Sequence, residues 1–202
     1  MENFRIIPVG ALAVNCYLIY DEKSELLLVV DPGGDADLIL SAARSFPFKR
    51  CGILLTHAHV DHIGAVPEVC SALNAGFVYL NDADKLLYNS PDNHILPYLP
   101  PVENLPRTTG VWPLEDVKVL FTPGHTPGGC CFYFSERKIL ISGDTLFAGS
   151  VGRTDLPGGS FATLEKSINR ELLTLPEDTF VYPGHGPRTT IGNEKQTNPY
   201  LT

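Results

Sequence analysis

The stretch Thr56-His57-Ala58-His59-Val60-Asp61-His62 places three imidazoles and one carboxylate within seven residues. It directly follows the apolar run 51–55, which predicts a short buried strand. Loops held by a rigid strand carry a large share of the functional side chains of folded proteins. We therefore expect residues 56–62 to form a functional loop at the edge of a sheet.

The composition of this loop indicates metal binding. Residues i and i+2 of an extended segment face the same way, so His57 and His59 can share one ligand set. The chain then turns, and Asp61 with His62 can face a second site beside the first. Imidazole and carboxylate groups without a clustered thiolate favour zinc, iron or manganese over a cysteine-based structural zinc site. A lone histidine is more often a hydrogen-bonded structural residue, and we interpret His94 in that way.

Two more histidines and one aspartate follow apolar stretches. His125 lies in Thr-Pro-Gly-His-Thr-Pro-Gly at 122–128, and His185 lies in Tyr-Pro-Gly-His-Gly at 182–186. An open catalytic metal site draws its ligands from several strand ends, so both histidines join the candidate set. Asp144 stands beside a glycine, where an aspartate is usually a turn or helix-cap residue. A two-metal site also needs a bridging carboxylate, and Asp144 is our candidate for it.

The bulk properties exclude several classes of protein. The chain has 202 residues, 44% hydrophobic, with 18 Gly and 17 Pro, which describes one globular domain rich in turns. A formal net charge of -8 disfavours nucleic-acid binding. The five cysteines form no C-x-x-C pair, so we expect buried free thiols in a reducing compartment. With no signal peptide and no apolar run near the roughly 20 residues of a membrane span, we expect a cytoplasmic protein that acts on a small molecule and contacts no membrane.

Apolar periodicity and turn signals predict strands interleaved with helices in both halves of the chain. This pattern favours two packed sheets with helices on their outer faces. A proline-rich stretch at 91–106 is expected to be a long surface loop. We expect strands at 5–9, 15–20, 26–31, 51–55, 77–80, 117–122, 130–135, 138–142 and 179–182, and helices at 38–43, 63–73, 82–88 and 161–173.

Taken in order, the motifs at 56–62, 122–128, 142–147 and 182–186 resemble those of the metallo-β-lactamase superfamily, and the resemblance covers nearly the whole chain. Within that superfamily the sequence is similar to the compact bacterial members of the glyoxalase II group, the hydroxyacylglutathione hydrolases. The resemblance implies an α/β fold over residues 1–202, the αβ/βα four-layer sandwich, as a single domain. It implies metals bound at one edge between the two sheets.

The resemblance also assigns the ligands and the reaction. It implies a metal-dependent hydrolase that binds two divalent metal ions, of which zinc is expected first and iron or manganese are the alternatives. The enzyme would cleave a small-molecule thioester by attack of a hydroxide that bridges the two metals. Asp61 would be the catalytic residue that orients this hydroxide. The antibiotic-hydrolysing branch is disfavoured, because it would be expected to have a cysteine in place of the bridging aspartate. One metal would be held by His57, His59 and His125, the other by Asp61, His62 and His185, with Asp144 bridging them.

Two departures from the glyoxalase II pattern keep an alternative open. The family continues with a C-terminal helical domain that binds glutathione, and we expect this chain to lack it. The run Gly152-Arg153-Thr154-Asp155 is also similar to that of the persulfide dioxygenases. These are mononuclear iron oxidoreductases, whose metal is held at positions matching His57, His125 and Asp144.

Two more residues receive open assignments. Arg153 can bind a substrate carboxylate through two parallel hydrogen bonds, although an arginine in a glycine-rich loop about as often braces that loop. Asp31 follows an expected strand, where it is either a hydrogen-bond partner of a metal ligand or a helix N-cap.

Overall fold

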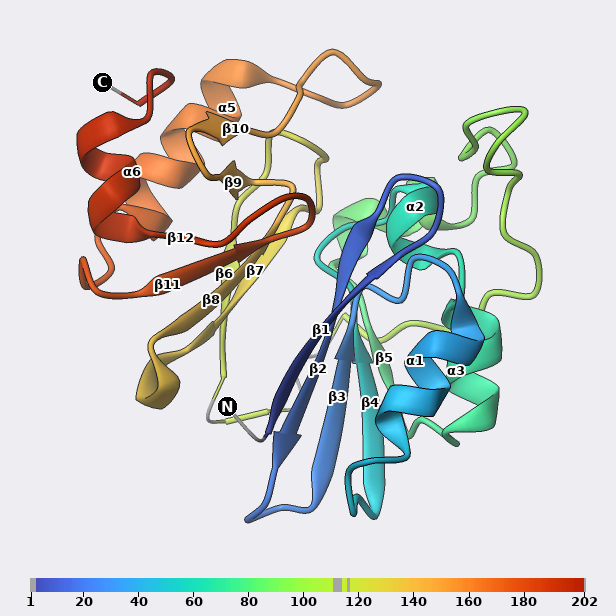
Figure 1. Ribbon diagram of the computed structural model, residues 1–202. Helices are drawn as coiled ribbons and strands as arrows, with labels where there is room; N and C mark the ends of the chain where they lie inside the picture. The colour runs from blue at the N-terminus through green and yellow to red at the C-terminus, as the bar shows by residue number, and fades with distance from the viewer. Residues whose placement is uncertain (1–2, 111–113, 116, 202) are drawn as a thin grey trace. The chain divides into compact units, whose positions relative to one another are not determined.

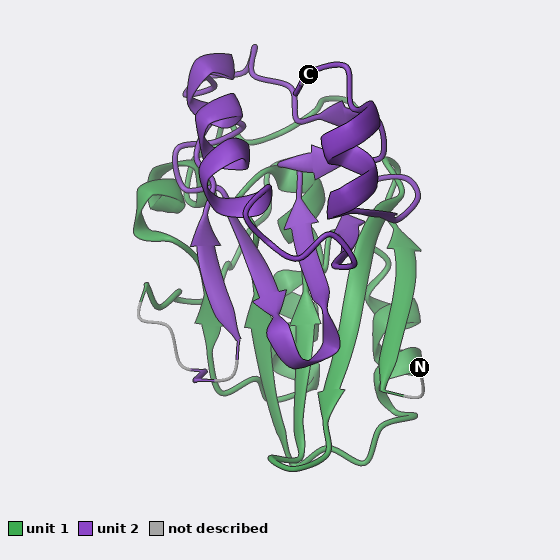
Figure 2. Ribbon diagram, turned by 90° about the vertical axis from the view of Figure 1, so that its left-hand side faces the viewer, with its two compact units in different colours: residues 1–111 green, residues 112–202 purple. Residues whose placement is uncertain are grey.

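The computed structural model describes residues 3–110, 114–115 and 117–201. The chain divides into two compact units, Met1–Val111 and Trp112–Thr202, coloured green and purple in Figure 2. Each unit has its own mixed sheet and its own apolar core. The expected α/β class is confirmed.

The sheet of unit 1 has five strands in the order β1-β2-β3-β4-β5. Strands β1 to β3 pair antiparallel, whereas β3 to β5 pair parallel. Because β3 and β4 run parallel, the residues that follow them meet at the same edge of the sheet. The bounds are β1 Phe4–Val9, β2 Val14–Asp21, β3 Leu26–Val30, β4 Arg50–Leu54 and β5 Val78–Tyr79.

The helices of unit 1 pack on this sheet, and Figure 1 shows α1 and α3 side by side against it. Leu27, Ile53 and Ile39 lie in the buried core. The helix expected at 63–73 corresponds to α3, which begins at Val66 and has Pro67 in its first turn, where a fixed φ and a missing N–H are tolerated. The short helix α2, which ends at Ile63, was not expected. The helices are α1 Ala36–Ala43, α2 Val60–Ile63, α3 Val66–Ala72, the 3-10 turn η1 Asp82–Asp84 and α4 Lys85–Tyr88.

The main sheet of unit 2 has the order β12-β11-β8-β7-β6, and a separate hairpin pairs β9 with β10. Only the β8–β11 pair of this sheet is parallel among the described residues. The residues after β8 and after β11 therefore meet at one edge. The bounds are β6 Lys118–Phe121, β7 Cys130–Phe134, β8 Ile139–Gly143, β9 Leu146–Phe147, β10 Ser150–Val151, β11 Phe180–Pro183 and β12 Thr189–Thr190.

Helix α5, Phe161–Ser167, runs on into the π-helical turn η3, Ile168–Leu172, as the expected helix at 161–173 predicts. A short 3-10 turn, η2, spans Ser135–Arg137. Helix α6, Ile191–Thr197, was not expected as an element, and neither were the strands β9, β10 and β12. Strands of two residues are too short to show an alternating pattern in the sequence.

All five cysteines are free, and four of them are buried. Burial raises the pKa of Cys51 to about 12, and burial also raises the pKa of the half-buried Cys70. Among the described residues there is no helix with the length and apolarity needed to cross a membrane.

We predict that Cys70 reacts first with a thiol reagent in the native protein. Only a thiolate attacks such reagents. The four other thiols are buried, and burial raises the pKa of Cys16 and Cys51. Mass spectrometry after brief treatment with iodoacetamide at pH 8 should find one label, on Cys70, and the C70S variant should remain unlabelled. Rapid native labelling of Cys16 or Cys51 would contradict the burial described above.

Candidate metal centre

Unit 1 gathers four ligand-type side chains directly after β4, as the sequence predicts. His57 and His62 are buried, and their ring centroids lie 4.1 Å apart. The ring of His59 stands edge-on to that of His57 at 4.8 Å. Oδ2 of Asp61 lies 3.8 Å from Nε2 of His62. Three imidazoles and one carboxylate therefore converge on one small region of this unit.

The fully buried Asp31 orients this group of side chains. Its Oδ1 accepts a hydrogen bond from the Thr56 amide at 2.8 Å, and its Oδ2 accepts one from the Thr56 hydroxyl at 2.7 Å. The same Oδ2 lies 3.1 Å from Nδ1 of His62. A carboxylate only accepts, so Nδ1 of His62 carries the proton and Nε2 is the nitrogen that would coordinate a metal. Asp31 is thus a hydrogen-bond partner of a candidate metal ligand, while the N-cap of α1 is Asp35.

Thr56 determines in the same way which ring nitrogen of His57 carries the proton. Its hydroxyl has one proton, which it donates to Asp31, so towards Nδ1 of His57, 3.1 Å away, it acts as an acceptor. Nδ1 of His57 is then the protonated nitrogen and Nε2 the coordinating one. Carboxylates and hydroxyls that fix the tautomer of a histidine in this way are typical of metal sites.

Sequence reasoning missed two buried residues that hold the loop backbone. The carboxylate of Asp84 accepts a hydrogen bond from the Ala58 amide at 3.1 Å, and the side-chain amide of Asn93 donates to the Ala58 carbonyl at 2.7 Å. Ala58 separates His57 from His59, so these bonds fix the backbone between the two histidines. Neither residue belongs to a recognisable motif, and no pattern in the sequence marks them.

Position 33, in the loop after β3, requires glycine because the backbone of Asp61 lies too close for a side chain. A Cβ at this position would lie 1.7 Å from the carbonyl oxygen of Asp61, far inside contact distance. The preceding Pro32 accepts a hydrogen bond from the Ala65 amide at 2.8 Å. The loop therefore presses directly on the backbone of α2, which carries Asp61 and His62.

Unit 2 places two of its predicted ligands, His125 and His185, beside the third, the carboxylate of Asp144. Oδ2 of Asp144, after β8, lies 3.6 Å from Nε2 of His125 and 3.7 Å from Nε2 of His185, which follows β11. Nδ1 of His125 lies 2.7 Å from the carbonyl oxygen of Arg153, an acceptor, so Nε2 is again the coordinating nitrogen. A carboxylate between two imidazoles from different strands has the surroundings that a bridging ligand needs.

The side chain of Arg153 makes two hydrogen bonds to the carboxylate of Asp155, at 2.8 and 2.7 Å, and both side chains are largely exposed. These bonds lower the pKa of Asp155 to about 2. Arg153 thus braces its loop with its side chain and orients His125 with its carbonyl. Substrate binding by Arg153 stays a prediction.

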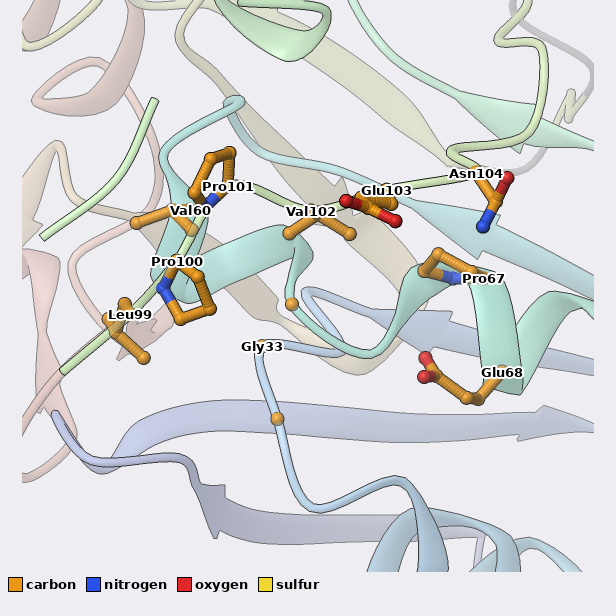
Figure 3. A pocket seen from close by; sticks show the side chains of 12 residues that line it. Gly33, Val60, Pro67, Glu68, Leu99, Pro100, Pro101, Val102, Glu103 and Asn104 are labelled. Atoms are coloured by element: carbon orange, nitrogen blue, oxygen red, sulfur yellow. The ribbon is translucent and has the colours of Figure 1, made fainter. Parts of the chain in front are cut away.

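A pocket of about 400 Å³ lies within unit 1, beside α2 and the proline-rich segment (Figure 3). Its wall is mainly apolar, and the carboxylates of Glu68 and Glu103 also line it. Val60, between His59 and Asp61 in the chain, belongs to the wall, so the pocket adjoins the ligand loop. The lining residues are Gly33, Gly34, Val60, Gly64, Pro67, Glu68, Leu99, Pro100, Pro101, Val102, Glu103 and Asn104.

The donor atoms of both units fit divalent transition metals. Imidazole nitrogens and carboxylate oxygens are the ligands that zinc, iron and manganese share, and no cysteine joins either group among the described residues. The second partners of His57, His62 and His125 leave the same nitrogen, Nε2, to face a metal. The geometry within each unit therefore supports metal binding.

Comparisons with known proteins agree with this geometry. Residues 9–185, which contain all seven candidate ligands, match the metallo-β-lactamase superfamily. A hydroxyacylglutathione hydrolase, GloC of Haemophilus influenzae, is 37% identical over 98% of each chain. The crystal structure of the BLEG-1 B3 metallo-β-lactamase is 38% identical, covers 98% of this chain and 99% of its own, and superposes with a TM-score of 0.89. That of TTHA1623 in a di-iron-bound form is also 38% identical, covers 98% and 100%, and has a TM-score of 0.85.

These matches extend across both units, at identities that show more than a shared fold. They agree with the α/β architecture described above. The chain therefore belongs to the metallo-β-lactamase superfamily, and it is similar to the hydroxyacylglutathione hydrolases of that superfamily.

Proposed function

We propose that the protein is a metal-dependent hydrolase that cleaves a thioester. The observation that carries the proposal is that Thr56 contacts Nδ1 of His57 and Asp31 contacts Nδ1 of His62. Nε2 of each histidine is then the nitrogen that would coordinate a metal. A relative named hydroxyacylglutathione hydrolase, similar along almost its entire length, supports the thioester as the substrate class.

The seven ligands are proposed to act as two sets joined by one carboxylate. Zinc is the ion we expect first, and the di-iron form of a structural neighbour supports iron as an occupant of the same kind of ligand set. The proposed assignment gives His57, His59 and His125 to one ion, Asp61, His62 and His185 to the other, and Asp144 to both.

Two divalent ions bound there would lower the pKa of water towards about 7 and polarise the substrate carbonyl. The residues of the chain supply orientation. The carboxylate of Asp61 accepts a hydrogen bond from the attacking water and directs its lone pair at the carbonyl carbon. Asp31 and Thr56 hold the imidazoles in place, so that little reorganisation precedes the reaction.

The surroundings of the ligand loop bear on the choice of thioester. The adjoining pocket is mainly apolar and carries Glu68 and Glu103, and the chain has a net charge of -8. Such a surface favours neutral or cationic acyl and thiol groups over polyanionic ones. Glutathione thioesters, which carry two carboxylates and one ammonium, are therefore one test substrate among several. Five free thiols support our further proposal of a cytoplasmic location.

Metal analysis with a substrate panel tests the proposal. We expect two divalent ions per chain and hydrolysis of S-lactoylglutathione or of a neutral thioester. Chelation should lower kcat by about 100-fold or more, because the hydroxide nucleophile is lost, and zinc should restore it. A β-lactam belongs in the panel because BLEG-1 is described as a metallo-β-lactamase. One iron per chain, with oxygen consumption on a persulfide, would instead establish the mononuclear oxidoreductase.

Changing Asp61 to Ala should lower kcat by about 100-fold or more, because the attacking water would lose the hydrogen-bond acceptor that orients it. The matched control is D178A, which removes an exposed carboxylate paired with Lys138 and should keep normal kcat. Steady-state kinetics are compared at equal metal content. Near-normal turnover by metal-loaded D61A would remove Asp61 from the mechanism.

Changing Asp31 to Asn should weaken metal binding by about 10- to 100-fold, the usual effect of losing the partner of a histidine ligand. The amide has only one acceptor atom, whereas Asp31 accepts from both the Thr56 amide and the Thr56 hydroxyl and also faces His62. Competition with a chromogenic chelator at pH 7 measures the affinity. The exposed Asp37 provides the control D37N, and equal affinities for both variants would show that Asp31 does not orient the ligands.

A further inference from the structure

The carboxylate of Glu194, on α6, is fully buried and receives four hydrogen bonds within unit 2. Oε1 accepts from the Thr189 hydroxyl at 2.6 Å and from the Asn193 side-chain amide at 3.0 Å. Oε2 accepts from the Gly149 amide at 2.9 Å and from the Asn198 side-chain amide at 2.8 Å. Burial alone would raise the pKa of Glu194, but these donors hold it below its usual value. Because each of its two oxygens accepts two hydrogen bonds, the Glu194 carboxylate is held in one position.

Two of these contacts reach the turn of the β9–β10 hairpin. The Gly149 amide donates to Glu194, and the side-chain amide of Asn198 donates to the Ser150 carbonyl at 3.1 Å as well as to Glu194. Asn198 is itself fully buried. Figure 1 shows α6 and the hairpin in the same part of unit 2, although they are about 45 positions apart in the chain. Side chains of the C-terminal segment therefore hold the hairpin through hydrogen bonds to its main-chain atoms.

The base of the same hairpin carries two parts of the metal centre. Asp144 directly precedes it, and the Gly152 amide closes it by donating to the Thr145 carbonyl at 3.2 Å. A Cβ on Gly152 would lie 1.9 Å from the Asp144 carbonyl oxygen, so the two ends of the hairpin are in tight contact. The next residue, Arg153, supplies the carbonyl that orients His125.

We propose that Glu194 and Asn198 are positioning residues of the metal centre. By holding the turn at 149–150, they set the hairpin whose two ends place the Asp144 carboxylate and the Arg153 carbonyl. This inference rests on the proposed function only in taking Asp144 and His125 as ligands. The segment at 189–198 then determines metal affinity, beyond its contribution to packing.

The test compares the variants E194Q and N198A with the matched control N193A. Glutamine has one acceptor oxygen, so in E194Q an amide N–H must face donors on one side of the group, whereas the shape of the side chain is kept. N198A removes the contact with the Ser150 carbonyl. N193A removes one of the two donors to Oε1 of Glu194, whereas Oε2, which binds the Gly149 amide of the hairpin, keeps both of its donors. The Asn193 side chain donates to Thr189 and Glu194 and not to the hairpin.

Cobalt is the probe, added to the metal-free chain and followed by its visible spectrum and by chelator competition. We expect E194Q and N198A to bind cobalt about 10-fold more weakly, with an altered spectrum, and N193A to match the wild type. Hydrogen exchange of the metal-free proteins should speed up in peptides covering 144–153 for E194Q and N198A, and not in those covering 51–62.

The outcomes separate this proposal from the proposed function. Weaker cobalt binding by E194Q and N198A supports the positioning role even where the wild type hydrolyses no thioester. If both variants bind cobalt as the wild type does, with an unchanged spectrum, the positioning role is overturned, whatever the hydrolase assays show. An equal loss of affinity in N193A would also overturn it, because a general loss of stability would then explain the effect.

Discussion

The buried carboxylate of Asp31 is the interaction on which the ligand loop depends. A charged group fully removed from water is costly unless hydrogen bonds compensate it, and Thr56 and His62 provide them. The same bonds tie the end of β3 to the start of the ligand loop and to α2. Removing this carboxylate would therefore leave the Thr56 amide, the Thr56 hydroxyl and the His62 ring with fewer partners at once. The same hydrogen bonds therefore hold the loop in place and orient the His62 ring.

Parallel strand pairs explain why ligands distant in sequence come together within each unit. In unit 1 the pair β3–β4 brings Asp31 to the ligand loop, and in unit 2 the pair β8–β11 brings Asp144 to His185. Each unit contains few parallel pairs, and both of these have polar residues at their carboxyl ends. The strand topology thus brings together residues that lie too far apart in the sequence to belong to one short motif.

Much of this could be predicted from the sequence, because strand-end clusters such as 56–62 combine an apolar run with ligand-type side chains. The α/β class and most strand positions followed from that pattern, and so did the choice of candidate ligands at strand ends. The division of these ligands between two metal ions stays a prediction. Asp84, Asn93 and Glu194 could not be found in this way, since they act through the backbone of distant residues and belong to no motif. Helix α2 was missed because its four residues, Val60–Ile63, are too few to show helical periodicity.

Several of the contacts that hold the candidate ligands end on main-chain atoms: the amide and carbonyl of Ala58, the amide of Gly149 and the carbonyls of Ser150 and Arg153. Main-chain atoms are the same in almost every amino acid. The side chain of the half-buried Ser150 can therefore change without loss of the hydrogen bond that its carbonyl accepts from Asn198. A hairpin held by its main chain in this way would tolerate substitutions in its turn while the positions of Asp144 and of the Arg153 carbonyl are kept.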